Sequence, residues 1–115
     1  MRAPFTPKWI ALGALVLSAA DAGSASAVAP VQIAIGAMTF SAPKTSVHVG
    51  DTVEWVNNDV VDHTATEKKT GVWNVSIAPG KRASVVMRKA GAFDYYCRYH
   101  PNMVARLVVT ATRKR

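Results

Sequence analysis

Cysteine is nearly absent from this sequence: its 115 residues include one, Cys97. A single cysteine excludes a disulfide within the chain, the usual support of small exported domains. Acidic residues are also few, with 7 Asp and Glu against 14 Lys and Arg, and the formal net charge is +7. No apolar run approaches the roughly 20 residues that cross a bilayer as a helix. With an internal disulfide and a membrane-spanning helix excluded, the sequence describes a small basic protein whose single thiol needs an explanation.

A sustained helical period is missing after residue 28, and short β-favouring segments take its place. Turn signals such as Gly50-Asp51 and Pro79-Gly80 separate these segments. The segments expected to form strands are 31–35, 45–49, 52–56, 63–66, 72–77, 84–87, 93–97 and 104–110. Seven or eight short strands at this spacing predict an all-β fold, an antiparallel Greek-key β-sandwich.

The N-terminus has the pattern of an export signal. Two basic residues precede or flank an apolar run of twelve residues at 9–20, which is too short to span a membrane. Small residues then allow cleavage after Ala27, with Ala29 as the alternative. The predicted organisation is a secretory signal peptide at 1–27 and one domain at 28–115. The expected location is therefore periplasmic or secreted.

One short stretch carries a metal-binding pattern: Cys97 is followed after two residues by His100, and after two more by Met103. Thiolate and thioether are soft ligands, and imidazole suits copper. One Cys and two His in a plane, with a weak axial Met, describe a mononuclear copper site. An inert buried thiol is the alternative for Cys97. The adjacent His and Met weigh against it, as does the export signal, because an exported free thiol is exposed to oxidation.

The second histidine must come from elsewhere in the chain, and there are two candidates, His63 and His48. Strand alternation turns Val47 and Val49 inward and His48 toward solvent. His63 follows a polar loop, where functional residues concentrate, and is preferred. Near the sulfur, a backbone N–H or a short polar side chain would tune the site. The candidates for that role are Asn57, Asn58 and Thr64.

The axial position also has rivals. Met103 is favoured because the loop delivers it to the site, whereas Met38 lies far back in the sequence and Met87 has the parity of a core residue. The same parity places Cys97 on one face with Phe93 and Tyr95. The sulfur is therefore expected at the end of the sandwich core, sheltered from water.

Two segments of the chain, at 49–64 and 91–103, resemble the blue copper proteins, which form the cupredoxin family. The run VGDTVEWVNND at 49–59, followed by His63-Thr64, is similar to the part that supplies the first ligand. The run GAFDYYC at 91–97, followed by His100-Pro101 and Met103, is similar to the part that supplies the others. The loop from Cys97 to Met103, called the ligand loop below, has the length found in amicyanins and is shorter than the corresponding loop of plastocyanin, pseudoazurin or azurin.

The resemblance implies His63, Cys97 and His100 as equatorial ligands and Met103 as the axial ligand. It implies one copper ion that cycles between Cu(II) and Cu(I), and no enzyme activity. The chain departs from the family pattern at four positions. Tyr99 replaces a common Pro, Asn102 a common aromatic, Val104 a common Gly, and Thr64 an Asn found in several relatives.

The expected function is one-electron transport between redox proteins. The resemblance implies a partner such as an exported dehydrogenase or a c-type cytochrome. An acidic partner is favoured if Arg98, Lys68 and Lys69 form a basic rim at the copper end. The alternative is a copper carrier or storage protein without a redox partner. Neither nucleic-acid binding nor stable membrane insertion after cleavage is expected, and the expected state is a monomer.

Overall fold

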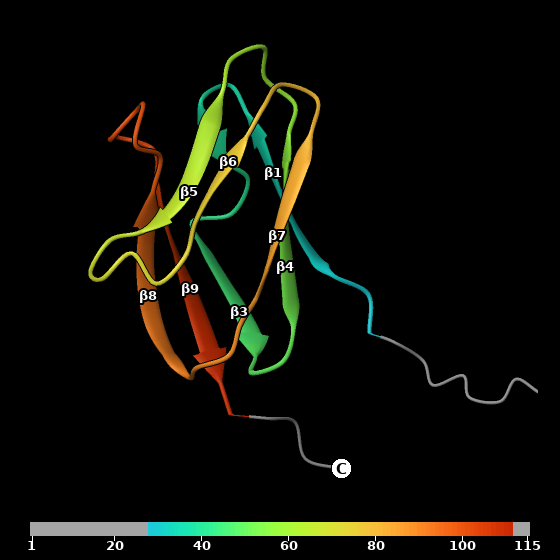
Figure 1. Cartoon of the computed structure of the whole chain (residues 1–115), viewed down its shortest axis with the longest axis vertical. Helices are drawn as coiled ribbons and strands as arrows, with labels where there is room; N and C mark the ends of the chain where they lie inside the picture. Colours follow the sequence, from blue (N-terminus) through green and yellow to red (C-terminus); the bar gives the residue numbers. More distant parts are fainter. Residues whose placement is uncertain (1–27, 112–115) are drawn as a thin grey trace, which may run out of the picture.

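The computed structural model describes residues 28–111, and in this part of the chain every regular element is a β-strand (Figure 1). The nine strands are β1 (Val31–Gly36), β2 (Thr39–Phe40), β3 (Lys44–His48), β4 (Thr52–Asn57), β5 (His63–Glu67), β6 (Asn74–Ile77), β7 (Arg82–Val86), β8 (Gly91–Tyr96) and β9 (Val104–Thr110). The predicted signal peptide, its cleavage site and the last four residues lie outside the described residues. Within that range, no helix has the length and apolar character needed to span a membrane.

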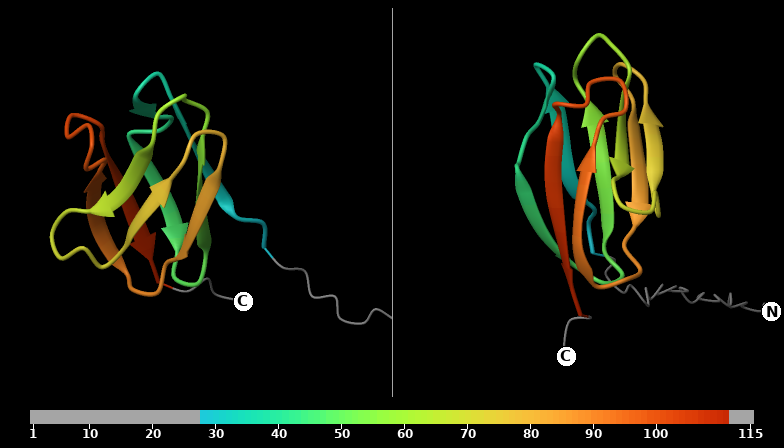
Figure 2. Two further views of the ribbon diagram at one scale, coloured as in Figure 1. Left: turned by 45° about the horizontal axis from the view of Figure 1, so that its top comes forward. Right: turned by 90° about the vertical axis from the view of Figure 1, so that its left-hand side faces the viewer.

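The strands form two sheets that face each other as layers (Figure 2). One sheet has the order β2-β1-β4-β7 and the other β3-β9-β8-β5-β6. The predicted all-β sandwich is confirmed, but the sheets are mixed rather than purely antiparallel. β1 pairs with β4 in parallel, and β3 pairs with β9 in parallel. Alternation along a single strand reveals its buried face but not the direction of its neighbour, so the sequence could not distinguish the two arrangements.

Most strands alternate between buried and more exposed residues, as a sandwich with one core requires. β4 and β9 show this period clearly, with Val53 and Trp55 buried in β4 and Leu107 and Val109 buried in β9. β2 was not expected from the sequence, because two residues are too short to show a period.

Aromatic rings fill the centre of the core. The Trp55 and Trp73 ring centroids are 5.4 Å apart, and Tyr95 lies 5.6 Å from Trp55. The Trp55 indole N–H donates to the Tyr95 hydroxyl at 3.3 Å. Burial raises the pKa of Tyr95 to about 12 although this hydrogen bond lowers it, so the phenol stays neutral. The three rings thus pack against one another in the core, and Tyr95 lies two residues before Cys97 on the same face of its strand.

β5 breaks the alternation, because all five of its residues are buried. Four of them are polar or charged, and buried polar groups need partners. Thr64 and Thr66 hydrogen-bond each other at 2.9 Å, and the Thr66 hydroxyl donates to Asn74 at 2.7 Å. The Glu67 carboxylate accepts backbone N–H groups of the turn that follows, at 2.8 to 3.3 Å. His63, the first residue of the strand, finds its partners at the candidate metal centre.

Candidate metal centre

His63 lies fully buried at the start of β5, with a partner at each ring nitrogen. Its Nδ1 is 3.7 Å from Cys97 Sγ, and its Nε2 is 2.8 Å from Asp59 Oδ2. An ionised carboxylate only accepts hydrogen bonds, so Nε2 is the nitrogen that carries the proton. That tautomer leaves the Nδ1 lone pair directed toward the cysteine, as a metal ligand requires.

Cys97 lies immediately after β8, in a loop that closes on itself. The Cys97 N–H donates to Met103 O at 3.1 Å, His100 N–H to Cys97 O at 3.2 Å, and Met103 N–H to His100 O at 2.8 Å. The strands at its base are paired through Tyr96 and Val104. These bonds fix the directions in which Cys97 and His100 leave the backbone.

The Cys97 sulfur is fully buried and receives hydrogen-bonding groups from several sides. The Thr64 N–H donates to Sγ at 3.4 Å, and His100 Nδ1 is 3.6 Å from Sγ. Burial raises the pKa of the Cys97 thiol, but contacts with His63, the Thr64 N–H and His100 lower it to about 6. The thiolate, which is the form that binds metals, is therefore favoured at neutral pH.

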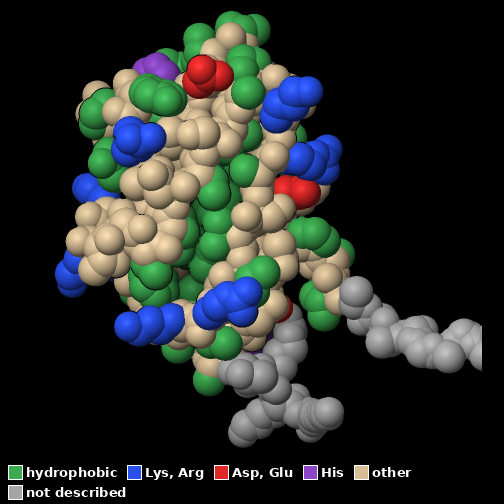
Figure 3. Space-filling model, in the orientation of Figure 1, with side chains coloured by type: hydrophobic (Ala, Val, Ile, Leu, Met, Phe, Trp, Pro, Cys, Tyr) green, Lys and Arg blue, Asp and Glu red, His purple; other side chains and the backbone are tan. Residues whose placement is uncertain are grey.

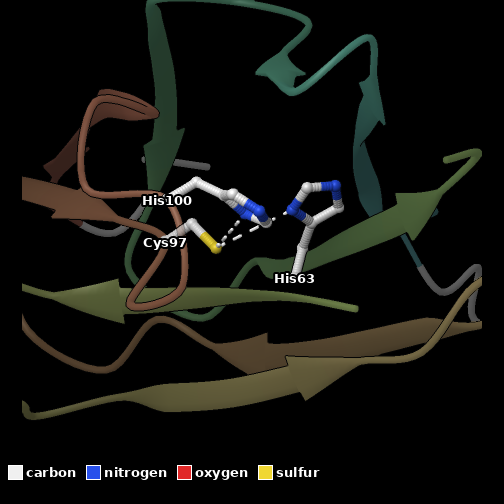
Figure 4. A group of neighbouring side chains, drawn as sticks. All are labelled: His63, Cys97 and His100. Carbon is white, nitrogen blue, oxygen red and sulfur yellow. Dashed lines mark hydrogen bonds between the residues drawn. The ribbon is translucent and has the colours of Figure 1, made fainter. Parts of the chain in front are cut away.

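Three donor atoms, one from the start of β5 and two from the loop after β8, converge at this point (Figure 4). They come from His63, Cys97 and His100, and lie within 4.8 Å of one another. A trigonal ion bonded to N and S at about 2.0 and 2.3 Å would separate those atoms by about 3.7 Å. The observed separations of 3.7 and 3.6 Å match this value. One thiolate and two imidazoles are a donor set that suits copper.

The Asp59 carboxylate links this cluster to the β1–β2 turn. Besides facing His63, it accepts the N–H of Ala37 at 2.7 Å and of Met38 at 2.9 Å. Both turn residues have positive φ, 51° and 60°, which is uncommon outside glycine. The Met38 N–H and His63 lower the pKa of Asp59, so the carboxylate is ionised. Asp59 was not predicted as a site residue, because an Asp that follows two Asn is equally typical of a turn.

Met103, the predicted axial ligand, is a buried residue at the end of the ligand loop. It lines a small hollow of about 300 Å³ together with Met38 and His100. Met103 is 5% exposed, whereas Met38 is 43% exposed. Met87 lies in the core, where its carbonyl accepts the Gly50 N–H. The structure thus gathers Met103 and Met38 on the same side of His100, and Met87 is not among them.

His48, the rejected candidate, lies at the opposite end of the sandwich. It pairs with Thr110, the last residue of β9, whereas Val104 at the start of β9 adjoins the ligand loop. Seven residues of extended strand separate these ends by roughly 20 Å. Its Nδ1 is 3.7 Å from an Asp51 carboxylate oxygen instead.

The expected basic rim is only partly present. Arg98 lies in the ligand loop, over the ring of Tyr99. Lys68 follows the far end of β5, where its ammonium lies 5.8 Å from the Tyr96 ring centroid. Lys69 lines a different cavity. Placing both lysines at the same end as His63 was wrong, because the five residues of β5 carry the chain away from that end (Figure 1).

Known proteins with this pattern of strands and ligands are similar over most of the chain. A family model for the cupredoxin-like domain matches residues 8–109. Amicyanin from Paracoccus denitrificans is 32% identical over 85 residues, covering 69% of this chain and 64% of its own length. Plastocyanin from Prochlorothrix hollandica is 37% identical over 101 residues, covering 76% of this chain and 74% of its own length.

Solved structures give the same result. The crystal structure of amicyanin from Paracoccus versutus has a TM-score of 0.63 and 27% sequence identity, covering 73% of this chain and 84% of that chain. A reduced Cu(I) form of an amicyanin variant has a TM-score of 0.64 and 28% identity, covering 73% and 85%. In sequence, the chain spans just under two thirds (64%) of the length of the two Paracoccus amicyanins that it matches.

Proposed function

Because the chain belongs to the family of cupredoxin-like domains, we propose that it is an exported type 1 copper protein that carries single electrons between redox proteins. The observation that carries this proposal is the convergence of His63, Cys97 and His100. A solved amicyanin relative is a Cu(I) form, which supports copper as the metal. Export rests on the signal peptide predicted at 1–27.

In this proposal His63, Cys97 and His100 would hold one copper ion, and the thioether of Met103, predicted as the axial ligand, would be a fourth and weaker donor. When bound, copper supplies a one-electron couple, Cu(II)/Cu(I). Catalytic metal sites keep a position open for substrate. Here the proposed ligand set is complete and its first histidine is fully buried. The protein is therefore proposed to be an electron carrier and not an enzyme.

The surrounding residues hold these ligands in place and tune them. Asp59 fixes the tautomer and orientation of the His63 ring. The Thr64 N–H donates to the sulfur, and its hydroxyl accepts the Arg98 N–H at 2.9 Å, which ties β5 to the ligand loop. A buried thiolate with one N–H donor has its negative charge partly compensated, and this lowers its donation to the metal.

The route for the electron is proposed to pass through His100, whose side chain is partly exposed among the proposed equatorial ligands. Exposed apolar residues lie in the ligand loop and in the neighbouring loop before β5, including Tyr99 at 53% and Val60 at 90% exposure. Figure 3 shows hydrophobic side chains beside a histidine at the upper end of the molecule. A small apolar face suits the weak, transient contacts of electron-transfer complexes.

Addition of Cu(II) to the purified protein tests the site. We expect one copper per chain and intense visible absorption from thiolate-to-copper charge transfer. Cys97→Ser should abolish the absorption, and His63→Ala or His100→Ala should alter it. His48→Ala is the matched control and should leave it unchanged. A colourless copper complex of the unmodified protein would refute the proposed type of site.

Electron exchange with a c-type cytochrome distinguishes electron transport from copper storage. Stopped-flow mixing of the reduced copper protein with an oxidised cytochrome should give a second-order rate that falls when Tyr99→Glu places a charge on the face beside His100. Ser46→Glu makes the same change in charge at an exposed position of β3, paired with Val108 and so farther from the ligand loop, and should have a much smaller effect. Copper that binds but exchanges no electrons with any cytochrome or dehydrogenase would favour storage.

A further inference from the structure

A second, larger cavity lies away from the candidate copper centre, on the open side of the sandwich. Its volume is about 530 Å³. β7 is the edge of one sheet and β6 the edge of the other. The chain joins them at one end through residues 78–81, and the two strands then diverge toward the other end (Figure 1). Where they part, the core is left partly uncovered, and we call this opening the edge groove.

The floor of the edge groove is apolar. Trp73 and Met87 are buried core residues at its base, and Phe93 is partly buried beside them. Val72, at 60% exposure, lies on its rim. Gly91 has φ +147°, and a Cβ atom there would lie 3.3 Å from the Phe93 ring. Glycine at this position therefore leaves room for the Phe93 ring.

The charges at the edge groove are basic and lie on its rim. The three basic residues are Lys69, Arg88 and Lys89, all exposed, and none forms an ion pair with another described residue. Glu67 is the acidic residue in the lining, and its carboxylate accepts the N–H groups of the turn after β5. Figure 3 shows the hollow with hydrophobic side chains inside it and Lys and Arg side chains at its lower end.

We propose that the edge groove binds a single small amphiphilic anion, namely an alkyl carboxylate. Its chain would lie on Trp73, Met87 and Phe93, and its carboxylate would face Lys69, Arg88 and Lys89. The volume falls within the range of small-molecule sites, which combine an apolar lining with a few charged groups. The separation of an apolar floor from a basic rim matches a ligand with one tail and one anionic head.

An acidic peptide is less suited to the same surface. An extended peptide would place its backbone N–H and C=O groups against the apolar floor, where they would lose water without gaining partners. A hydrocarbon tail has no such groups. The small molecule is therefore the occupant that the lining favours.

Calorimetric titration of the copper-loaded protein with decanoate, below its micelle concentration, tests the proposal. We expect one molecule bound per chain, with affinity that rises about two- to fourfold for each methylene from octanoate to decanoate. Acetate should show no binding, and decylammonium should bind at least tenfold more weakly than decanoate. Equal binding of decanoate and decylammonium, or binding of acetate, would overturn the proposal.

Variants then locate the site. The double variant Arg88→Glu/Lys89→Glu should weaken decanoate binding at least tenfold. Lys44→Glu/Lys81→Glu makes the same change in net charge outside the groove and should weaken it less than twofold. Decanoate should shift the NMR signals of Trp73 and Phe93 and leave the visible absorption of the copper centre unchanged.

Several results would contradict the assignment. Equal effects of the two double variants would mean that binding depends on net charge alone. Shifts confined to the His100 end would place the ligand on the electron-transfer face. Binding to phosphatidylglycerol vesicles without binding of monomeric decanoate would assign the surface to a membrane. Each of these outcomes leaves the proposed copper site intact.

Discussion

Asp59 connects two neighbours of the copper centre through one carboxylate. It faces the buried nitrogen of His63 and holds the N–H groups of Ala37 and Met38 in a turn with positive φ. The position of the His63 ring is thus tied to the turn that carries Met38, which lines the hollow beside His100. In the proposed site, this side chain would act on the metal through His63 and not by contact with it.

Asp59→Ala should weaken copper binding by about 10- to 100-fold, the usual effect of removing the outer partner of a ligating histidine. The His63 ring would lose the acceptor that fixes its tautomer. Competition with a copper chelator measures the change. Asp62→Ala removes an exposed carboxylate from the same loop and is the control. Equal affinities of the two variants would show that Asp59 serves the turn alone.

Met103→Leu should still bind copper and stay coloured, but with a higher reduction potential. As a weak additional donor, the thioether would compensate the higher charge of Cu(II) more than that of Cu(I), so its loss should destabilise Cu(II) more. Protein-film voltammetry gives the potential. Met38→Leu, on the same side of His100, is the matched variant and should leave the potential nearly unchanged. If Met38→Leu raises it instead, the axial assignment belongs to Met38.

At the scale of the strand, the sequence predicted the position of β5 but not the burial of its last residue. The sequence predicted an extended segment at 63–66, and the structure has one. It gave no indication that Glu67, the next residue, is buried. Charged residues before a glycine usually indicate a solvated turn. Glu67 is buried because β5 lies between β6 and β8 in its sheet. The pairing of strands depends on the tertiary fold, so the local sequence does not show it.

Because of Glu67, the free energy of unfolding is expected to fall at acid pH. Burial raises its pKa, but the N–H groups of Thr70 and Lys69 and the Thr70 hydroxyl lower it to about 2, against an ordinary 4.5. A lowered folded-state pKa means that the stabilisation is complete above about pH 4.5 and is lost as the pH falls toward 2.

In Glu67→Gln we therefore expect a lower free energy of unfolding at pH 7 and a smaller loss of it between pH 4.5 and pH 2. Urea unfolding across this pH series measures both. Glu54→Gln changes a carboxylate on the other sheet that pairs with Arg82, and it is the control. The same pH dependence in Glu67→Gln and in the unmodified protein would refute this role.

At the scale of the whole molecule, copper should contribute much of the stability, because the domain is small and has no internal disulfide. The proposed ligands converge only in the folded chain, so free copper at 100 times its Kd should stabilise it by about 2.7 kcal/mol. Scanning calorimetry should show a Tm higher by roughly 10–20 °C. In Cys97→Ser this shift should largely disappear. A Tm that copper leaves unchanged would contradict the prediction.

Short-range patterns in the sequence predicted the sandwich and the loop that holds Cys97 and His100, whereas His63 was chosen over His48 by strand parity and by its place after a polar loop. The spacing from Cys97 to Met103 and the inward parity of Tyr95 are local features. The sequence did not predict the parallel strand pairs, the contact of Asp59 with Ala37, or the edge groove. Each of these joins segments distant along the chain, and only the packing of the two sheets brings them together.

The closure of the ligand loop on its own backbone has a consequence for how such proteins can diverge. The Tyr96–Val104 pair closes the base of the loop, so the pairing of β8 with β9 is complete before the loop begins. Doubling the length of a loop costs only about 0.6 kcal/mol in closure entropy. Residues can therefore be inserted between Cys97 and Met103, or the whole segment exchanged as a cassette, with the nine strands left in register. In such a scaffold, natural variation or laboratory grafting can change the redox potential and the choice of partner independently of the fold.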